Sequence, residues 1–333
     1  MYNLELERVV LEINKRKAGK VLLQLPDGIR PFAMQLITAI KQSTGAKVIL
    51  SGNSCYGACD IALTQAQKLA VDLILHYGHT PMVKHPEIPV IYIHASIDVD
   101  VDRLIEAVLP SLKKNKSIGL ATTIQHAHQV QEIKEKLAEK KIKLFVGHGV
   151  GKTPMDAQIL GCSYMTAINI MDKVDAYLYV GGGQFHPTGI VMSTGKPVIV
   201  ANPYNGEVSR ITEDDLIDVA KRRMAAITIA QNSKKFGILV SSKPGQNNIE
   251  KAIELQDQIC EQGKEAIIIY MDEVRPEHVN NFSEPEILVN TACPRIVIDG
   301  INGINRPMLT INETKVVLGY RKWETLWGDR YFV

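Results

Sequence analysis

Five cysteines are the residues of this 333-residue chain best suited to chemistry. Cys55 and Cys59 lie four residues apart in CYGAC, Cys162 lies in LGCSYM, Cys260 in DQICEQ and Cys293 in NTACPRI. An odd number of cysteines in a chain this long does not resemble the disulfide framework of a small secreted domain. The sequence therefore predicts free thiols, metal ligands or catalytic groups in a reducing compartment.

Three of these thiols, Cys59, Cys162 and Cys293, follow predicted strands in three separate parts of the chain. Structural zinc normally has four ligands, commonly supplied in CxxC pairs, and the sequence contains no such pair. Three thiolates brought together suit an iron–sulfur cluster better, and Cys293-Pro294 resembles the Cys-Pro end of ferredoxin motifs. A cubic cluster held by three cysteines would keep one iron open for chemistry.

Other roles for the cysteines stay open at this stage. Each of the three thiols could instead be a buried small hydrophobic residue, which is the common role of a free cysteine. Cys260 lies on the predicted apolar stripe of a helix, which favours core packing. Cys55 could face Cys59 across a helical turn and form a local metal or redox pair with it.

The elements that would position these thiols recur three times along the chain. Residues 19–50, 115–147 and 233–272 each show an apolar strand, a turn, an amphipathic helix and a second strand. The predicted buried stripes are Ala33, Leu36, Ile37 and Ile40, then Val130, Ile133 and Leu137, then Ile249, Ile253 and Cys260. A third apolar segment follows in every copy, and the first two copies add another strand.

Strands that alternate with helices predict right-handed βαβ units and parallel sheets covered by helices. We therefore expect three similar α/β domains with small parallel sheets, and one large doubly wound sheet is the alternative. The predicted domains are residues 1–110 with Cys59, residues 111–232 with Cys162 and residues 233–333 with Cys293. Since ligands sit at the carboxyl ends of parallel strands, three such domains in a ring would aim their loops at one centre.

Composition and charge exclude several classes of function. A net charge of +2 without a clustered basic patch argues against a nucleic-acid partner. The N-terminal segment MYNLELERVVLEINKRK interrupts its apolar positions with charges, unlike a signal peptide, and no run of about 20 apolar residues predicts a membrane span. We expect a soluble cytoplasmic protein.

Two groups near predicted strand ends could contact a cofactor in the second copy. The predicted contacts there are Gly181, Gly182, Gly183, Gln184 and His186. The glycines could let backbone amides approach a ligand, and a tight turn is the alternative. Gln184 and His186 could reach a cofactor or a target imidazole, or simply cap the turn.

Arg295, two residues after Cys293, is the predicted contact in the third copy. Its guanidinium could bind a carboxylate bidentately. A surface salt bridge is the alternative role. No Ser/His/Asp arrangement, P-loop or paired-carboxylate motif competes with the cysteines as the source of chemistry.

Taken together, the motifs resemble those of the archaeal diphthamide synthases, the radical 2-(3-amino-3-carboxypropyl)histidine synthases. The matching stretches are LPDG at 25–28, YGACD at 56–60, YGH at 77–79, LGC at 160–162, GGGQFHPTG at 181–189 and NTACPRIVID at 290–299. The resemblance covers nearly the whole chain in order. YGAC together with NTACPRI is its specific part.

The resemblance implies a homodimer in which each subunit holds a [4Fe-4S] cluster through Cys59, Cys162 and Cys293. It implies an electron donor and S-adenosylmethionine as co-substrate, cleaved between sulfur and the γ-carbon. The resulting 3-amino-3-carboxypropyl radical would add to the imidazole of a histidine in elongation factor 2, the first step of diphthamide biosynthesis. Cys55 is not a ligand in this pattern. Ala62 stands where the CxxxCxxC motif of commoner radical enzymes has its third cysteine.

Two further functions fit a cluster held by three cysteines. One is a Lewis-acid cluster enzyme resembling quinolinate synthase, whose three similar domains also hold a three-cysteine cluster and whose dehydration chemistry needs no electron. The other is a non-catalytic cluster protein that serves as an electron carrier or a scaffold.

Overall fold

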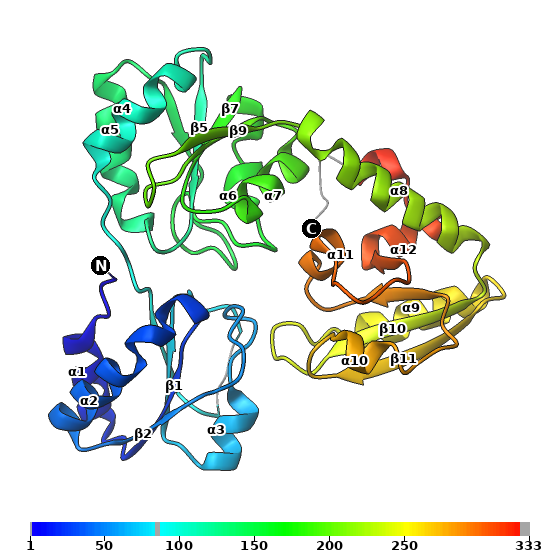
Figure 1. The fold of residues 1–333 in the computed structure, drawn as a ribbon, viewed down its shortest axis with the longest axis horizontal. Coiled ribbons are helices and arrows are strands. Elements are labelled where there is room, and N and C mark those ends of the chain that lie inside the picture. Colours follow the sequence, from blue (N-terminus) through cyan, green and yellow to red (C-terminus); the bar gives the residue numbers. More distant parts are fainter. Residues whose placement is uncertain (1, 84–86, 327–333) are drawn as a thin grey trace.

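The computed structural model of the chain describes residues 2–83 and 87–326, which form three α/β units (Figure 1). Each unit has a sheet of its own, and the three units lie at the corners of a triangle rather than in one row. The alternative of a single large doubly wound sheet is therefore wrong. The expected architecture of three similar units with small, mainly parallel sheets is confirmed.

The first unit has the strand order β2-β1-β3-β4, with every pair parallel. Its elements are α1 (Leu6–Arg16), β1 (Lys20–Gln24), η1 (Asp27–Phe32), α2 (Ala33–Thr44), β2 (Lys47–Leu50), α3 (Leu63–Leu69), β3 (Leu73–Tyr77) and β4 (Val90–Ile93). The central strands β1 and β3 are almost wholly buried, as expected for a parallel sheet covered on both faces.

The second unit has the order β6-β5-β7-β8-β9, and its last strand is antiparallel to β8. Its elements are α4 (Val101–Leu112), β5 (Ile118–Thr122), η2 (Ala127–Gln129), α5 (Val130–Glu139), β6 (Leu144–Val146), α6 (Met165–Ile168), η3 (Met171–Lys173), β7 (Ala176–Val180), α7 (Phe185–Thr194), β8 (Val198–Ala201), β9 (Val208–Ile211) and η4 (Asp214–Leu216). The edge strand β9 was not predicted.

The third unit has the order β11-β10-β12-β13, again all parallel. Its elements are α8 (Ile217–Asn232), β10 (Lys235–Ser241), α9 (Ile249–Glu261), β11 (Glu265–Met271), α10 (Pro276–Val279), β12 (Ile287–Asn290), α11 (Arg295–Asp299), β13 (Met308–Thr310), α12 (Ile311–Val317) and η5 (Trp323–Thr325). The third copy thus carries a fourth strand, β13, that the sequence pattern did not predict.

The helix stripes predicted for the first two copies are buried, apart from the half-buried Ile37. The third was wrong at Ile253 and Cys260, although Ile249 packs against the core. In α9 the buried side chains are Ala252, Leu255 and Ile259, while Ile253 is 44% exposed and Cys260 is exposed. The true stripe lies one residue before the predicted one, a rotation of about 100° around the helix. Cys260 is therefore not a core residue.

Two helices that lie between the sheets in sequence, α4 and α8, each pack against the sheet that follows them. Helix α4 packs against the second sheet, in a cluster that includes Leu104, Ile118 and Ile199, although the predicted boundary after residue 110 falls inside this helix. Helix α8 packs against the third sheet, where Ile227 meets Phe236. Division of the chain after residues 110 and 232 stays a prediction.

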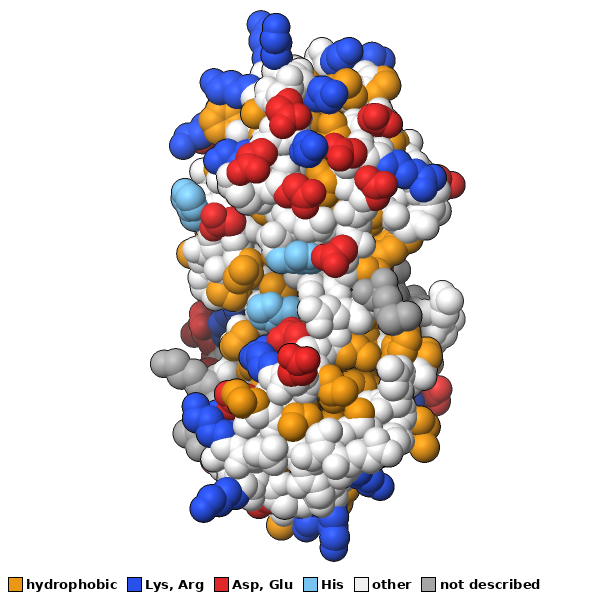
Figure 2. Space-filling model, turned by 90° about the vertical axis from the view of Figure 1, so that its left-hand side faces the viewer, with side chains coloured by type: hydrophobic (Ala, Val, Ile, Leu, Met, Phe, Trp, Pro, Cys, Tyr) orange, Lys and Arg blue, Asp and Glu red, His pale blue; other side chains and the backbone are white. Residues whose placement is uncertain are grey.

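One face of the molecule carries mixed charge. On the face shown in Figure 2, Lys and Arg side chains are interspersed with Asp and Glu rather than gathered into one field. Among the described residues, no helix combines the length and the apolar character that a membrane crossing requires.

Candidate iron–sulfur site

A cavity of about 750 Å³ lies where the three units meet. Loops that follow β1, β2 and β3 of the first unit, β5 and β6 of the second, and β10, β11 and β12 of the third line it. The carboxyl ends of the parallel strands thus converge, as predicted for α/β units. The volume falls within the range of about 300–1,000 Å³ that is typical of small-molecule sites.

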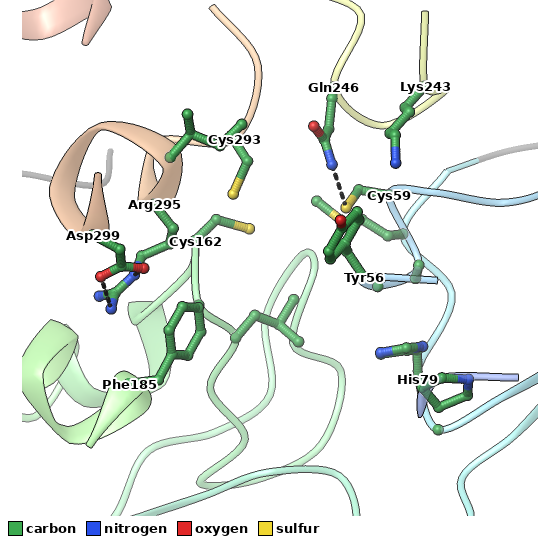
Figure 3. A pocket seen from close by; sticks show the side chains of 18 of the residues that line it. Tyr56, Cys59, His79, Cys162, Phe185, Lys243, Gln246, Cys293, Arg295 and Asp299 are labelled. Carbon is green, nitrogen blue, oxygen red and sulfur yellow. Dashed lines mark hydrogen bonds and ion pairs between the residues drawn. The ribbon is translucent and has the colours of Figure 1, made fainter. Parts of the chain in front are cut away.

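Cys59, Cys162 and Cys293 all line this cavity, one from each unit (Figure 3). Cys59 follows β2, and Cys162 lies in the turn between Leu160 and Ser163, whose backbone groups bond to each other at 2.9 and 3.2 Å. Cys293 precedes α11, and the Asn290 side-chain amide donates to its carbonyl at 2.8 Å. The structure therefore brings together the three cysteines that the repeats singled out. Their ligation of a cluster stays a prediction.

The electrostatics of the three thiols fit a metal cluster. Burial, together with the negative charges that Cys293 and Cys59 would carry as thiolates, raises the pKa of Cys162 to about 12. Burial also raises the pKa of Cys59 and of Cys293. Three buried thiolates would repel one another, and the positive charge of iron would reverse that repulsion. Sulfur donors of this kind suit iron–sulfur clusters.

Cys55 lies outside the described lining of the cavity and takes part in a different group. Sγ of Cys55 and ring nitrogens of His76 and His79 lie within 4.8 Å of one another. Nε2 of His76 is 2.9 Å from Nδ1 of His79, and Nδ1 of His76 is 2.9 Å from Oε1 of Gln24. Cys55 is therefore grouped with two histidines, of which His79 lines the cavity.

A loop of the third unit, residues 241–246, begins at the last residue of β10 and holds the segment that carries Cys59. Nε2 of Gln246 lies 3.2 Å from Sγ of Cys59, and the amide of Gly245 donates to the Cys59 carbonyl at 2.8 Å. Nζ of Lys243 lies 2.6 Å from Asp60. We call this segment the 241–246 loop.

Lys243 also anchors the loop to its own unit and to an aromatic ring. Its Nζ lies 3.2 Å from Oε1 of Glu273 and 4.5 Å from the ring centroid of Tyr56, a cation–π contact. Because Tyr56 belongs to the first unit and Glu273 to the third, this ammonium group joins the two units at the edge of the cavity.

Arg295 joins the second and third units. It is only 5% exposed, so the predicted alternative of a surface salt bridge is wrong about its location. Its Nη2 and Nε bond to the two carboxylate oxygens of Asp299 at 2.7 and 3.1 Å. Its guanidinium lies 4.0 Å from the ring centroid of Phe185, in the orientation shown in Figure 3. The bidentate edge of Arg295 therefore already faces a carboxylate.

His186 is the other predicted cofactor contact that lines the cavity. Burial lowers its pKa to about 4, and the nearby charge of Arg295 acts in the same direction, so the imidazole is neutral at pH 7. Its ring lies against Tyr179 and Phe185, with centroids 6.0 and 4.9 Å away. A neutral imidazole can donate one hydrogen bond and accept another.

The glycine run before His186 forms a turn. Gly181, Gly182, Gly183 and Gln184 are not among the described residues that line the cavity. Gly181 and Gly183 have φ angles of 155° and 72°, which favour glycine. The structure thus agrees with the tight-turn alternative, and a cofactor contact by these four residues stays a prediction.

Sequence reasoning missed Lys243 and Gln246, although the repeats held a usable signal. The 241–246 loop follows the first strand of the third copy, and LPDG and residues 123–125 follow the first strands of the other two. All three segments contribute residues to the cavity lining. Equivalent positions in a repeat could therefore have identified them.

Comparison with known proteins finds the same family by a family model and by individual relatives. The family model for diphthamide synthesis proteins matches residues 25–328. The 2-(3-amino-3-carboxypropyl)histidine synthase of Pyrococcus horikoshii is 32% identical over 97% of this chain and 92% of its own length. Subunit 1 of the synthase from Saccharomyces cerevisiae is 28% identical over 99% of this chain and 77% of its own length.

Solved structures agree with the sequence relatives. The crystal structure of Dph2 from Pyrococcus horikoshii matches with a TM-score of 0.88 and 32% identity, covering 97% of this chain and 93% of that one. The structure of Dph2 from the same organism with a 4Fe-4S cluster also matches with a TM-score of 0.88, at 31% identity and the same coverage. With three sheets around one cavity and a family match over most of its length, the chain belongs to the diphthamide synthesis protein family.

Proposed function

We propose that this protein is a 2-(3-amino-3-carboxypropyl)histidine synthase. It transfers the 3-amino-3-carboxypropyl group of S-adenosylmethionine to the imidazole of a histidine in elongation factor 2, the first step of diphthamide biosynthesis. The observation that carries the proposal is the convergence of Cys59, Cys162 and Cys293, one from each unit, on a single cavity. Membership of the family supports it.

In this proposal the three thiolates hold a [4Fe-4S] cluster. When bound, a reduced cluster supplies the electron that cleaves the bond between the sulfur and the γ-carbon of S-adenosylmethionine. The chain's own contribution is to position the reactants and to keep water away from them. Apolar side chains of the cavity wall, including Ile124, Ile159 and Ile296, serve that second purpose.

Three cavity residues, Arg295, Asp299 and His186, are proposed to contact S-adenosylmethionine. The methionyl group of this molecule carries both an ammonium and a carboxylate. The ion pair of Arg295 with Asp299 presents both signs of charge at the cavity wall, so it can meet both groups. His186, neutral at pH 7, can add a hydrogen bond to the co-substrate or to the target imidazole.

The resemblance also supports proposals about partners and place. The protein acts as a homodimer in the cytoplasm, receives electrons from a separate donor and binds elongation factor 2 as its protein substrate. Neither a nucleic acid nor a membrane is a partner in this proposal. The mixed charge on the face in Figure 2 agrees with a protein partner.

The test is iron and sulfide content with electron paramagnetic resonance, on anaerobically purified protein. Cys59→Ala, Cys162→Ala and Cys293→Ala are each expected to lose the cluster, while Cys260→Ala, at an exposed position, keeps it. Cys55→Ala, outside the described cavity lining, is also expected to keep it. Loss in Cys55→Ala together with retention in Cys293→Ala would contradict the proposed ligand set.

Turnover distinguishes the proposed function from its two alternatives. With dithionite, the wild type is expected to convert S-adenosylmethionine to methylthioadenosine and to add the aminocarboxypropyl mass to elongation factor 2. Chemistry that proceeds without reductant would favour a Lewis-acid cluster enzyme. A loaded cluster that reduces normally but gives no methylthioadenosine would favour an electron carrier or scaffold.

A further inference from the structure

We propose that Gln246 is a positioning residue that donates an N–H···S hydrogen bond to Cys59 and thereby raises the reduction potential of the bound cluster. The inference rests on the proposed function, because it requires Cys59 to be a cluster ligand. It adds a residue from the third unit that acts on the ligand of the first.

The contact between Gln246 and Cys59 has the geometry and chemistry of a hydrogen bond to a sulfur ligand. Nε2 of Gln246 lies 3.2 Å from Sγ of Cys59, and Gln246 is only 7% exposed. A metal-bound thiolate offers lone pairs and no proton, so the group that faces it must be a donor. The side-chain amide of Gln246 supplies that donor through its NH₂ group.

The 241–246 loop holds this amide in place. The Gly245 amide donates to the Cys59 carbonyl at 2.8 Å, and Lys243 reaches Asp60 at 2.6 Å. The backbone amide of Gln246 donates to the Lys243 carbonyl at 2.9 Å, which closes the loop on itself. Because the loop is tied to residues 59 and 60 at two further points, the N–H···S contact is preorganised.

The kind of donor at Cys59 makes the inference testable. At Cys293 the backbone amide of Ile296 donates to the carbonyl of that residue at 3.1 Å. At Cys59 the donor is the side chain of Gln246. A side-chain donor can be removed by substitution without altering the backbone, which makes Cys59 the site where the effect can be measured.

The direction of the effect follows from charge. Reduction adds an electron to a cluster, and part of that negative charge lies on the ligand sulfurs. An N–H dipole aimed at a sulfur stabilises the reduced state more than the oxidised state, so it raises the potential. Gln246 therefore makes the cluster easier for its donor to reduce.

The experiment is a reductive titration of the cluster-loaded protein, followed by electron paramagnetic resonance. Gln246→Met keeps the size of the side chain and removes the donor. The variant is expected to make the cluster about tenfold harder to reduce, which lowers its reduction potential by about 59 mV for a one-electron couple.

The matched control is Gln125→Met, at a cavity residue whose Nε2 donates to the Gly78 carbonyl at 2.8 Å and not to sulfur. The control is expected to keep the wild-type potential, and an unchanged potential in Gln246→Met would overturn the inference.

A second measurement decides the matter even if Gln246→Met does not take up a cluster. Wild-type protein labelled with ¹⁵N in its glutamine side chains is expected to show a ¹⁵N coupling to the reduced cluster in pulsed resonance. Gln125→Met should retain that coupling.

The outcomes separate the two proposals. A cluster-loaded wild type without the ¹⁵N coupling would refute the role of Gln246 and leave the proposed function intact. Normal coupling without methylthioadenosine formation would refute the proposed function alone, and failure of the wild type to bind iron would refute both.

Discussion

Gly245 of the third unit packs directly against the backbone of Cys59 in the first. A β-carbon at position 245 would lie 2.5 Å from the Cys59 α-carbon, which is closer than two non-bonded carbon atoms can approach. The absence of a side chain at residue 245 is therefore what lets the 241–246 loop reach the sulfur.

We expect Gly245→Ala to push this loop away from Cys59 and to weaken cluster retention. Overpacking of this kind should also lower the free energy of unfolding by about 1–3 kcal/mol. Iron content after anaerobic gel filtration, together with denaturant unfolding, measures both effects. Gly52→Ala is the matched control, because a β-carbon there meets no atom within 4 Å. Equal iron retention in the two variants would contradict the prediction.

The ion pair between Arg223 and Glu313 should be a major contributor to the stability of the third unit. Nε and Nη2 of Arg223 on α8 lie 2.8 Å from the two carboxylate oxygens of Glu313 on α12, and both side chains are buried. We expect Glu313→Ala to lower the free energy of unfolding by about 3–5 kcal/mol, because it leaves a buried charge without its counterion.

The control for this effect is the exposed pair of Lys221 with Asp218, 3.9 Å apart on the same helix α8. Lys221→Ala should change the free energy of unfolding by less than about 1 kcal/mol. Urea denaturation of the three proteins gives the comparison. Similar small losses in both variants would show that the buried pair adds little.

Acid should destabilise the protein through two cavity histidines. Burial lowers the pKa of His79 and of His186 to about 4, from 6.5 in an unfolded chain. Between these pH values the unfolded state binds more protons, so stability falls as the pH drops from 6.5 toward 4. The slope should be about 1.4 kcal/mol per pH unit for each histidine.

Denaturant unfolding of the metal-free protein at pH 7 and pH 5 checks this prediction. A variant carrying both His79→Gln and His186→Gln should lose clearly less stability between the two pH values than the wild type does. Parallel losses in the two proteins would show that other groups control the acid response.

Cysteine alkylation should separate the five thiols in metal-free protein. The thiolate is the reactive form, and burial raises the pKa of Cys162 from 9.0 to about 12, which cuts its thiolate fraction about 1,000-fold. Exposed Cys260 should therefore react first with iodoacetamide at pH 7.5, and Cys162 far more slowly. Peptide mass spectrometry reads out the order, and early modification of Cys162 would contradict the burial seen here.

Local pattern was enough to predict the repeats and the thiols. Each copy shows an apolar strand, a turn and a helix, and these patterns depend only on residues that are close in the sequence. The same reasoning placed Cys59, Cys162 and Cys293 after strands, where the carboxyl ends of parallel strands gather. All three line the same cavity in the structure.

Tertiary structure alone decided which surfaces meet. In α9 apolar residues lie on two adjacent faces, so only packing against β10 and β11 determines that Leu255 is buried and Cys260 is exposed. The partner of Arg295 and the contact of Gln246 with Cys59 likewise depend on distance in space. Gln246 and Cys59 are 187 residues apart, and a contact over that separation leaves no periodic trace in the sequence. Local residue patterns thus predicted the elements and the candidate ligands, whereas the folded chain determined the surroundings that set their chemistry.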